Sequence, residues 1–258
     1  IRRNLTLEAN PFLQDHVIGG HAVLPSVCAI GWIANACEQL YPGYKFFSCQ
    51  DYKALKGIVF DETLASEYIL DLEKMPRANG GEIAFEAKIW SKTQEDKTRY
   101  HYSAQITLLR QLPTPPTYAA FNNMQDQAIP GASLYQDGTL FHGPCFQGVE
   151  QVLNVNPQNL TMRCILPKIN LRSQGQFPVQ TFNPYIADIQ FQSLVIWAWH
   201  FHQAGSLPLR ADKGEQFRAI PFDETFYVSM QTRSSTANSL VGDVIAHDAQ
   251  GQVYVRVL

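Results

Sequence analysis

Residues 189–201 read IQFQSLVIWAWHF, and this stretch decides which kind of fold the chain can adopt. Apolar side chains, Trp197 and Trp199 among them, fall on every side of a helix with a 3.6-residue period, so no continuous polar face is left for solvent. A helix of this kind has to be buried. We therefore predict a buried helix from about Pro184 to His202, wrapped by a curved antiparallel sheet.

The same order of elements occurs earlier in the chain. A second apolar helix is predicted from about Pro25 to Leu40, and strand candidates follow it at 57–60, 66–72, 82–90 and 100–109. In the third of these, Ile83, Phe85, Ala87 and Ile89 alternate with more polar residues, which is typical of a strand with one buried face. Around the later helix the strand candidates lie at 148–155, 160–166, 219–233 and 239–258, the last with a turn at DAQG (248–251). This pattern predicts an α+β fold of two similar modules that share one sheet.

A proline-rich segment separates the two modules. Residues 112–130, LPTPPTYAAFNNMQDQAIP, carry four prolines and no alternating pattern, as a linker does. We predict an N-terminal module at 1–111, a linker at 112–138 and a C-terminal module at 139–258. Because the chain starts without methionine and stops within a strand-like pattern, we expect it to be a domain of a longer protein.

Composition excludes several classes of function. A net charge of −3 gives no electrostatic reason to expect nucleic acid or an anionic membrane as a partner, and no apolar run reaches the roughly 20 residues that a membrane span needs. No secretory signal opens the chain. The five cysteines are odd in number and never adopt a CxxC spacing, which argues against zinc and disulfides and favours reduced, mostly buried thiols in a cytoplasmic protein. GxSxG, GxGxxG, P-loop and HExxH motifs are absent from the sequence, and no metal is expected.

The stretch HVIGGHAVLP, residues 16–25, is a candidate for a catalytic base. Gly19 and Gly20 allow a positive φ and a close approach of a ligand to the backbone, and Pro25 fits the first turn of the following helix. Free N–H groups and the helix dipole there favour a substrate oxygen that gains negative charge. A neutral His16 imidazole at that place is a credible general base. A lone histidine before a helix is often only structural, and His21 is a competing candidate.

The stretch FNPYIADIQFQ, residues 182–192, offers an acid. Asp188 lies near the start of a helix that is otherwise almost wholly apolar, where desolvation should raise its pKa and keep a proton available for a leaving hydroxyl. Gln192, one turn later, lies on the same face and can hold the carboxyl in place. Alternatively, Asp188 is an ordinary acidic partner of the helix dipole.

A third stretch, LFHGPCFQG at 140–148, is either a turn at Gly143–Pro144 or the lining of a narrow tunnel.

Taken together, these motifs resemble those of dehydratase domains of polyketide synthases and related fatty acid synthases. His16, Gly20 and Pro25 match the HxxxGxxxxP motif of that family, and Asp188 with Gln192 matches its DxxxQ pattern. The residues HGPCFQG (142–148) resemble its YGPxFQG stretch, which brings in His142, Gly143, Pro144 and Phe146, and AIPF (219–222) is similar to its LPF-type motif. Two positions depart from the pattern: His142 stands where tyrosine is usual, and Asn183 where histidine is usual.

The resemblance implies a double hotdog fold and a hydro-lyase that removes water from a 3-hydroxyacyl thioester to give a 2-enoyl thioester. It implies that His16 removes the α-proton, that Asp188 protonates the departing β-hydroxyl and that the Gly20 N–H polarises the thioester carbonyl. The substrate would be carried on the phosphopantetheine of an acyl carrier protein within a megasynthase, with no further cofactor. The stretch YKALKGIVFDETL (52–64) resembles the polyunsaturated fatty acid synthase branch of the family more than modular polyketide synthases.

Other functions are also consistent with these residues. A product-template cyclase of similar fold also uses a His/Asp pair, a hotdog thioesterase is less consistent with Asp188 and Gln192, and a dehydratase-like module could serve only as a scaffold. Acyl chain length, stereochemistry and the choice between a monomer and a homodimer are not specified by the sequence.

Overall fold

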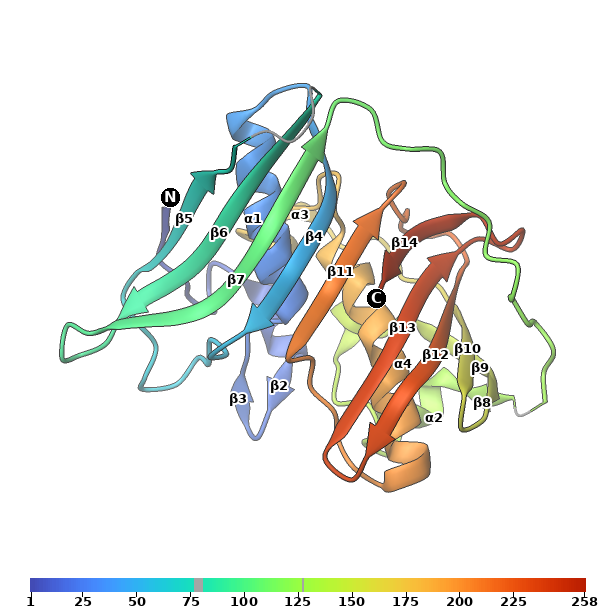
Figure 1. Ribbon diagram of the computed structural model, residues 1–258. Helices are drawn as coiled ribbons and strands as arrows, with labels where there is room; N and C mark the ends of the chain where they lie inside the picture. Colours follow the sequence, from blue (N-terminus) through green and yellow to red (C-terminus); the bar gives the residue numbers. More distant parts are fainter. Residues whose placement is uncertain (77–80, 127) are drawn as a thin grey trace. The chain divides into compact units, whose positions relative to one another are not determined.

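The computed structural model describes residues 1–76, 81–126 and 128–258, and the chain divides into two compact units (Figure 1). The first unit comprises Ile1–Pro113, Asn170–Pro184 and Pro208–Gln216. The second comprises Thr114–Ile169, Tyr185–Leu207 and Phe217–Leu258. Each unit is therefore built from three separate stretches of the chain.

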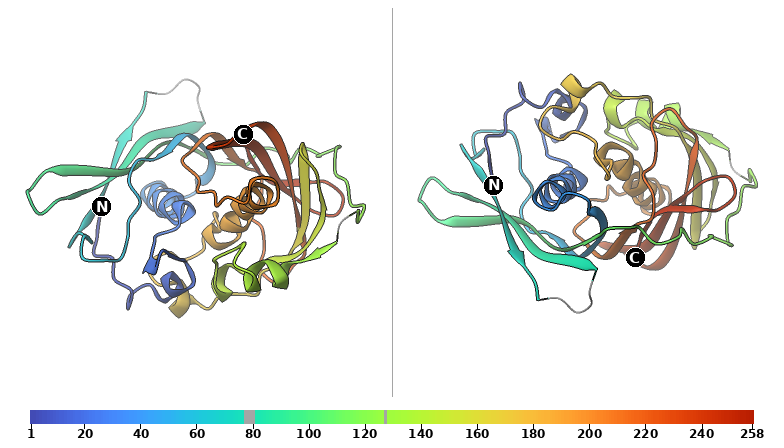
Figure 2. Two further views of the ribbon diagram at one scale, coloured as in Figure 1. Left: turned by 90° about the horizontal axis from the view of Figure 1, so that it is seen from below. Right: turned by 90° about the horizontal axis from the view of Figure 1, so that it is seen from above.

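The first unit is a helix packed on an antiparallel sheet. Helix α1 (Ser26–Leu40) contacts strands β4 (Lys45–Ala54) and β7 (Thr98–Leu109), and Figure 2 shows it nearly end-on beside the curving strands. The sheet order is β1 (Arg2–Arg3), β5 (Tyr68–Lys74), β6 (Glu82–Lys92), β7, β4 and β11 (Arg210–Gln216). A 3-10 turn η1 (Pro11–Asp15), a hairpin of β2 (Val17–Ile18) and β3 (His21–Ala22), and α3 (Leu171–Gln174) complete the unit.

The second unit repeats this plan with different elements. Its long helix is α4 (Pro184–His202), and its sheet order is β14 (Val253–Val257), β13 (Ser239–His247), β12 (Phe226–Thr236), β10 (Asn159–Cys164), β9 (Val149–Val155) and β8 (Ile129–Pro130). Neighbouring strands pair antiparallel. Helix α2 (Gly131–Gln136) and the 3-10 turn η2 (Pro144–Phe146) lie between β8 and β9 in the sequence.

Burial follows from the apolar patterns. In α1 every residue from Val27 to Cys37 is buried, and in α4 burial continues from Pro184 to Ala198 with only Phe191 and Leu194 half-buried. In β6 the side chains of Ile83, Phe85, Ala87 and Ile89 are between 0% and 3% exposed, which confirms the predicted alternation. Both predicted helices and the final hairpin are confirmed, because apolar surface of this extent is stable only when it is removed from water.

Some strand predictions were wrong or incomplete. Residues 57–60 form no strand, and only Val59 makes an isolated bridge, to Val23. In 219–233 the strand begins only at Phe226, whereas β4 and β11 were not predicted. Helix α2 occupies part of the interval that the sequence assigns to a linker.

Four of the five cysteines are buried, namely Cys28, Cys37, Cys49 and Cys164. No described helix is long and apolar enough to span a membrane.

Candidate active site

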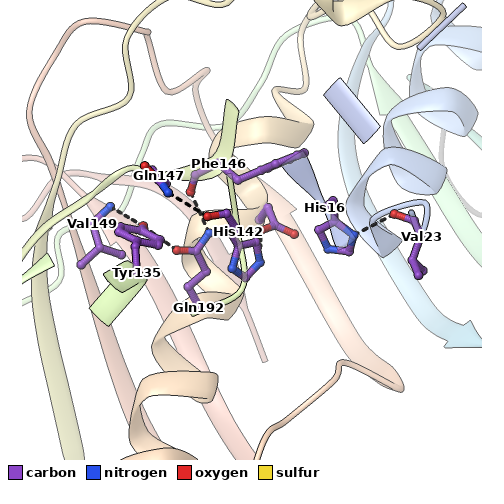
Figure 3. A network of polar contacts seen from close by, with 9 residues as sticks. His16, Val23, Tyr135, His142, Phe146, Gln147, Val149 and Gln192 are labelled. Atoms are coloured by element: carbon purple, nitrogen blue, oxygen red, sulfur yellow. Dashed lines mark hydrogen bonds and ion pairs between the residues drawn. The ribbon is translucent and has the colours of Figure 1, made fainter. Parts of the chain in front are cut away.

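His16 lies at the foot of the β2–β3 hairpin in the first unit, and it is 6% exposed. It ends η1, where its N–H donates to the Leu13 carbonyl, and its own carbonyl accepts from the Val23 N–H at 3.0 Å. The turn η1 and the residue that follows β3 therefore hold the backbone of His16 from its two sides. The side chain is fixed as well, because ring atom Nδ1 lies 2.7 Å from the Val23 carbonyl oxygen (Figure 3).

The contact with Val23 sets the tautomer of the His16 ring. A carbonyl oxygen can only accept, so Nδ1 must carry the hydrogen and donate it. In the neutral ring, Nε2 then holds the lone pair. A histidine held in this way has a basic nitrogen of defined position, which is what a general base requires.

The two glycines of the stretch form the turn of the hairpin. Ile18 pairs with His21, so Gly19 and Gly20 are the two central residues, with φ of 61° and 87°. Positive φ at both positions defines the type I′ turn that suits a two-residue hairpin loop, and glycine adopts it without strain. The expectation of positive φ is confirmed.

Pro25 lies at the N-cap of α1, directly before Ser26. The Ser26 carbonyl accepts a hydrogen bond from the Tyr52 hydroxyl at 3.0 Å.

Asp188 lies in the second turn of α4, in the second unit, and is 7% exposed. Gln192, one turn later, is 1% exposed, and its side-chain Nε2 donates to Asp188 Oδ2 at 3.2 Å and to the Phe146 carbonyl at 2.9 Å. The predicted juxtaposition of carboxyl and amide on one helix face is thus present. The amide also ties the carboxyl to the turn at 144–146.

His142 contacts the same carboxyl. Its Nε2 lies 3.0 Å from Asp188 Oδ2, and both side chains are almost fully buried, with 4% and 10% exposed. The His142 ring stacks on Phe141 with a centroid distance of 4.0 Å, and its carbonyl accepts from the Gln147 side chain at 2.9 Å. A buried carboxyl is stable only when it is hydrogen-bonded, paired or protonated. Here an imidazole and an amide both meet one of its oxygens.

Tyr135 extends this cluster and was not predicted from the sequence. Its hydroxyl donates to Gln192 Oε1 at 2.9 Å and accepts from the Val149 N–H at 3.1 Å (Figure 3). Burial raises the pKa of Tyr135 well above its usual value, so the hydroxyl keeps its proton. The tyrosine fixes which end of the Gln192 amide is the oxygen, and thereby directs the Gln192 N–H groups toward Asp188.

Close packing holds the segment 142–148 against α4. Gly143 and Pro144 open the 3-10 turn η2, with proline at its first position. A Cβ on Gly148 would come within 2.1 Å of the Ile189 side chain, and one on Gly131 within 1.7 Å of the Val149 carbonyl oxygen. Gly148 therefore allows the segment to approach α4 closely, and Gly131 allows the start of α2 to approach β9.

The predicted site residues thus form two groups. His16, Gly20 and Pro25 belong to the first unit, whereas Asp188, Gln192, His142, Gly143, Pro144 and Phe146 belong to the second. One group offers a basic nitrogen near a helix N-terminus, and the other offers a buried carboxyl with an imidazole beside it. A basic nitrogen of this kind suits the removal of a proton, and a buried carboxyl of this kind suits the donation of one.

Family models match both parts of the chain. One, described as "Polyketide synthase dehydratase N-terminal domain", matches residues 116–258, and another, described as "Polyketide synthase dehydratase domain", matches residues 1–88. One of the subunits of the polyunsaturated fatty acid synthase from Thraustochytrium sp. is 28% identical over 263 residues. That alignment covers 100% of this chain but only 9% of the relative.

Solved structures show the same fold. The dehydratase domain of RzxB from Pseudomonas fluorescens superposes with a TM-score of 0.77 at 18% identity, covering 99% of this chain and 90% of that one. A trans-AT polyketide synthase dehydratase domain from Brevibacillus brevis gives a TM-score of 0.75 at 19% identity, with coverage of 99% and 91%.

Proposed function

Because the chain belongs to the family of polyketide synthase dehydratase domains and has their double hotdog fold, we propose that it removes water from a 3-hydroxyacyl thioester to give a 2-enoyl thioester. The observation that carries this proposal is the buried Asp188 carboxyl, held at Oδ2 by His142 and Gln192. A carboxyl kept out of water on an apolar helix suits proton donation to a poor leaving group such as hydroxide.

The first proton transfer is assigned to His16. Its Nε2 accepts the proton from Cα of the substrate, while Nδ1–H stays on the Val23 carbonyl and stabilises the imidazolium that forms. The electron pair of the broken C–H bond moves toward the thioester carbonyl. The N–H of Gly20 and the N-terminal end of α1 are the proposed donors for the negative charge that develops on that oxygen.

The second transfer is assigned to Asp188. The carboxyl gives its proton to the β-hydroxyl, the Cβ–O bond breaks, and the electron pair from Cα forms the double bond, so that one water leaves and no oxidant or reductant is consumed. Gln192 orients the carboxyl, and His142 contacts the same carboxyl oxygen. Between turnovers His16 releases one proton and Asp188 takes one up, so the cycle consumes no net proton. His142 thus lies beside the proposed acid at the position where the family usually has tyrosine.

The partner that follows from this chemistry is an acyl carrier protein whose phosphopantetheine presents the thioester. The chain spans 9% of the length of the curated relative it matches, which supports a place within a larger synthase. The identity of 28% to a component of a polyunsaturated fatty acid synthase supports fatty acyl rather than polyketide substrates.

The reverse reaction tests the reaction class. The chain is incubated with crotonyl pantetheine and with a longer 2-enoyl pantetheine, and the gain of one water is followed by mass spectrometry. We expect hydration by the wild type and by His21→Ala, the matched control in the same hairpin, but not by His16→Ala. If neither thioester is hydrated by the wild type, the dehydratase proposal is wrong, and a cyclase or a scaffold module takes its place.

A further inference from the structure

One end of the strand pair β4–β11 in the first unit carries an unusual arrangement of charge. Lys53 lies directly opposite Arg210 in the register of the two strands, and both side chains are exposed. Two cations opposite each other on a sheet repel, and this costs stability. Within the described residues no ion pair joins either of them to an acid. The nearest exposed acids on these strands are Asp51 and Asp212, each two residues along from the cation of its own strand, and within the described residues neither forms an ion pair with Lys53 or Arg210.

Two leucines extend the same end of the strand pair. Leu55 is 54% exposed and Leu209 is 71% exposed. They are neighbours, because the Ala54 N–H donates to the Leu209 carbonyl at 2.8 Å. A third exposed cation, Lys56, follows Leu55, and its backbone N–H is held by the His101 carbonyl. We refer to Lys53, Leu55, Lys56, Leu209 and Arg210 as the strand-end surface.

The strand-end surface lies next to the hairpin that carries His16. The segment after Lys56 runs along the hairpin, where the Leu24 N–H donates to the Ile58 carbonyl at 2.9 Å and the Phe60 N–H to the Ala22 carbonyl at 2.8 Å. Figure 1 shows the end of β4 and the start of β11 on the side of the unit where β2 and β3 lie. A partner bound at this surface would therefore be anchored close to the proposed base.

We propose that the strand-end surface docks the carrier protein that delivers the acyl thioester, through an acidic patch with an apolar side chain at its centre. This inference rests on the proposed function. The repulsion between Lys53 and Arg210 is relieved when a carboxylate comes between them, and the two leucines offer an apolar contact of the kind that anchors small interfaces. Two leucines at strand ends offer a small apolar contact, which suits a single apolar side chain of a partner protein. Binding to a lipid surface instead uses the long apolar face of an amphipathic helix.

The test compares carrier-bound and carrier-free substrates. In the double variant Lys53→Glu/Arg210→Glu we expect the KM for crotonyl carrier protein to rise at least tenfold, while hydration of crotonyl pantetheine is unchanged. Leu209→Ser should raise the same KM several-fold. The matched control is Lys45→Glu/Arg110→Glu, which reverses one exposed lysine at the other end of β4 and one exposed arginine directly after Leu109, the residue that pairs with Lys45. Lys45 lies eight residues before Lys53 on β4, so that end is about 26 Å away at the usual rise of a strand.

Direct binding separates failure of this inference from failure of the proposed function. Fluorescence anisotropy with labelled acyl carrier protein needs no turnover. We expect the affinity of the wild type to fall with added salt. We also expect the control variant to bind as the wild type does, and Lys53→Glu/Arg210→Glu to bind more weakly than the wild type. Equal affinity for the wild type and this variant, an equal loss in the control variant, or binding to anionic vesicles instead of carrier protein would overturn the inference. Each of these outcomes can be read even if crotonyl pantetheine is not hydrated.

Discussion

Tyr135→Phe removes a single oxygen atom and tests how the proposed acid is held. In the wild type that hydroxyl satisfies two buried groups, Gln192 Oε1 at 2.9 Å and the Val149 N–H at 3.1 Å. Leaving a buried polar group without a partner costs about 1–3 kcal/mol, so the loss of both bonds should lower the free energy of unfolding by about 2–4 kcal/mol. For a chain of this size that corresponds to a fall in Tm of very roughly 5–15 °C.

The activity of Tyr135→Phe should fall as well, because the Gln192 amide is no longer held in one orientation. Asp188 keeps its contact with His142, so we expect kcat for hydration to fall by about tenfold, or about 1.4 kcal/mol in the barrier, rather than to vanish. Thermal melting and steady-state kinetics at a temperature well below both Tm values measure the two effects. Tyr100→Phe, at an exposed tyrosine, is the control. A Tyr135→Phe protein with wild-type Tm and kcat would refute the reasoning.

Further predictions concern histidines. His142→Phe removes the nitrogen 3.0 Å from Asp188 Oδ2 and should lower kcat at least tenfold. His142→Gln keeps an N–H donor at that place and should therefore have a higher kcat than His142→Phe. Equal kcat values for the two variants would argue against a functional contact between His142 and Asp188. Burial lowers the pKa of His247 and of His101 in the folded state, so the unfolded chain binds protons first. The urea midpoint should therefore be steady above about pH 6.5 and fall as the pH drops below it, less steeply in His247→Leu; a midpoint that rises on acidification contradicts this.

Much of the fold follows from local patterns in the sequence. The apolar helices and the alternation in β6 were predictable because each buries a face that the sequence marks residue by residue. β4 was missed because a bulge at Asp51, where φ is 49°, interrupts its alternation. β11 reads RADKGEQ and has no apolar periodicity, so it is a strand only because it pairs with β4.

The candidate site was predicted in part for the same reason. Spacing on one helix turn is local, so the contact of Asp188 with Gln192 could be expected from the sequence. The contact of His142 with Asp188 depends on how the turn at 144–146 packs against α4, which Gly148 permits and no local pattern reveals. Tyr135 lies in a short helix within a segment that the prolines mark as a linker, so its part in the cluster had no sequence signal.

Changing the leaving group tests most directly whether His16 acts as the base and Asp188 as the acid. A 3-chlorobutyryl thioester loses chloride, which needs no proton, whereas a 3-hydroxybutyryl thioester loses water only with an acid. Elimination from both substrates is measured for the wild type, Asp188→Asn and His16→Ala against the uncatalysed rate. We predict that Asp188→Asn is inactive on the hydroxy substrate but close to wild type on the chloro substrate, and that His16→Ala is inactive on both. Rescue of His16→Ala by the chloro substrate, or failure of Asp188→Asn on it with the protein folded, would contradict the assigned roles.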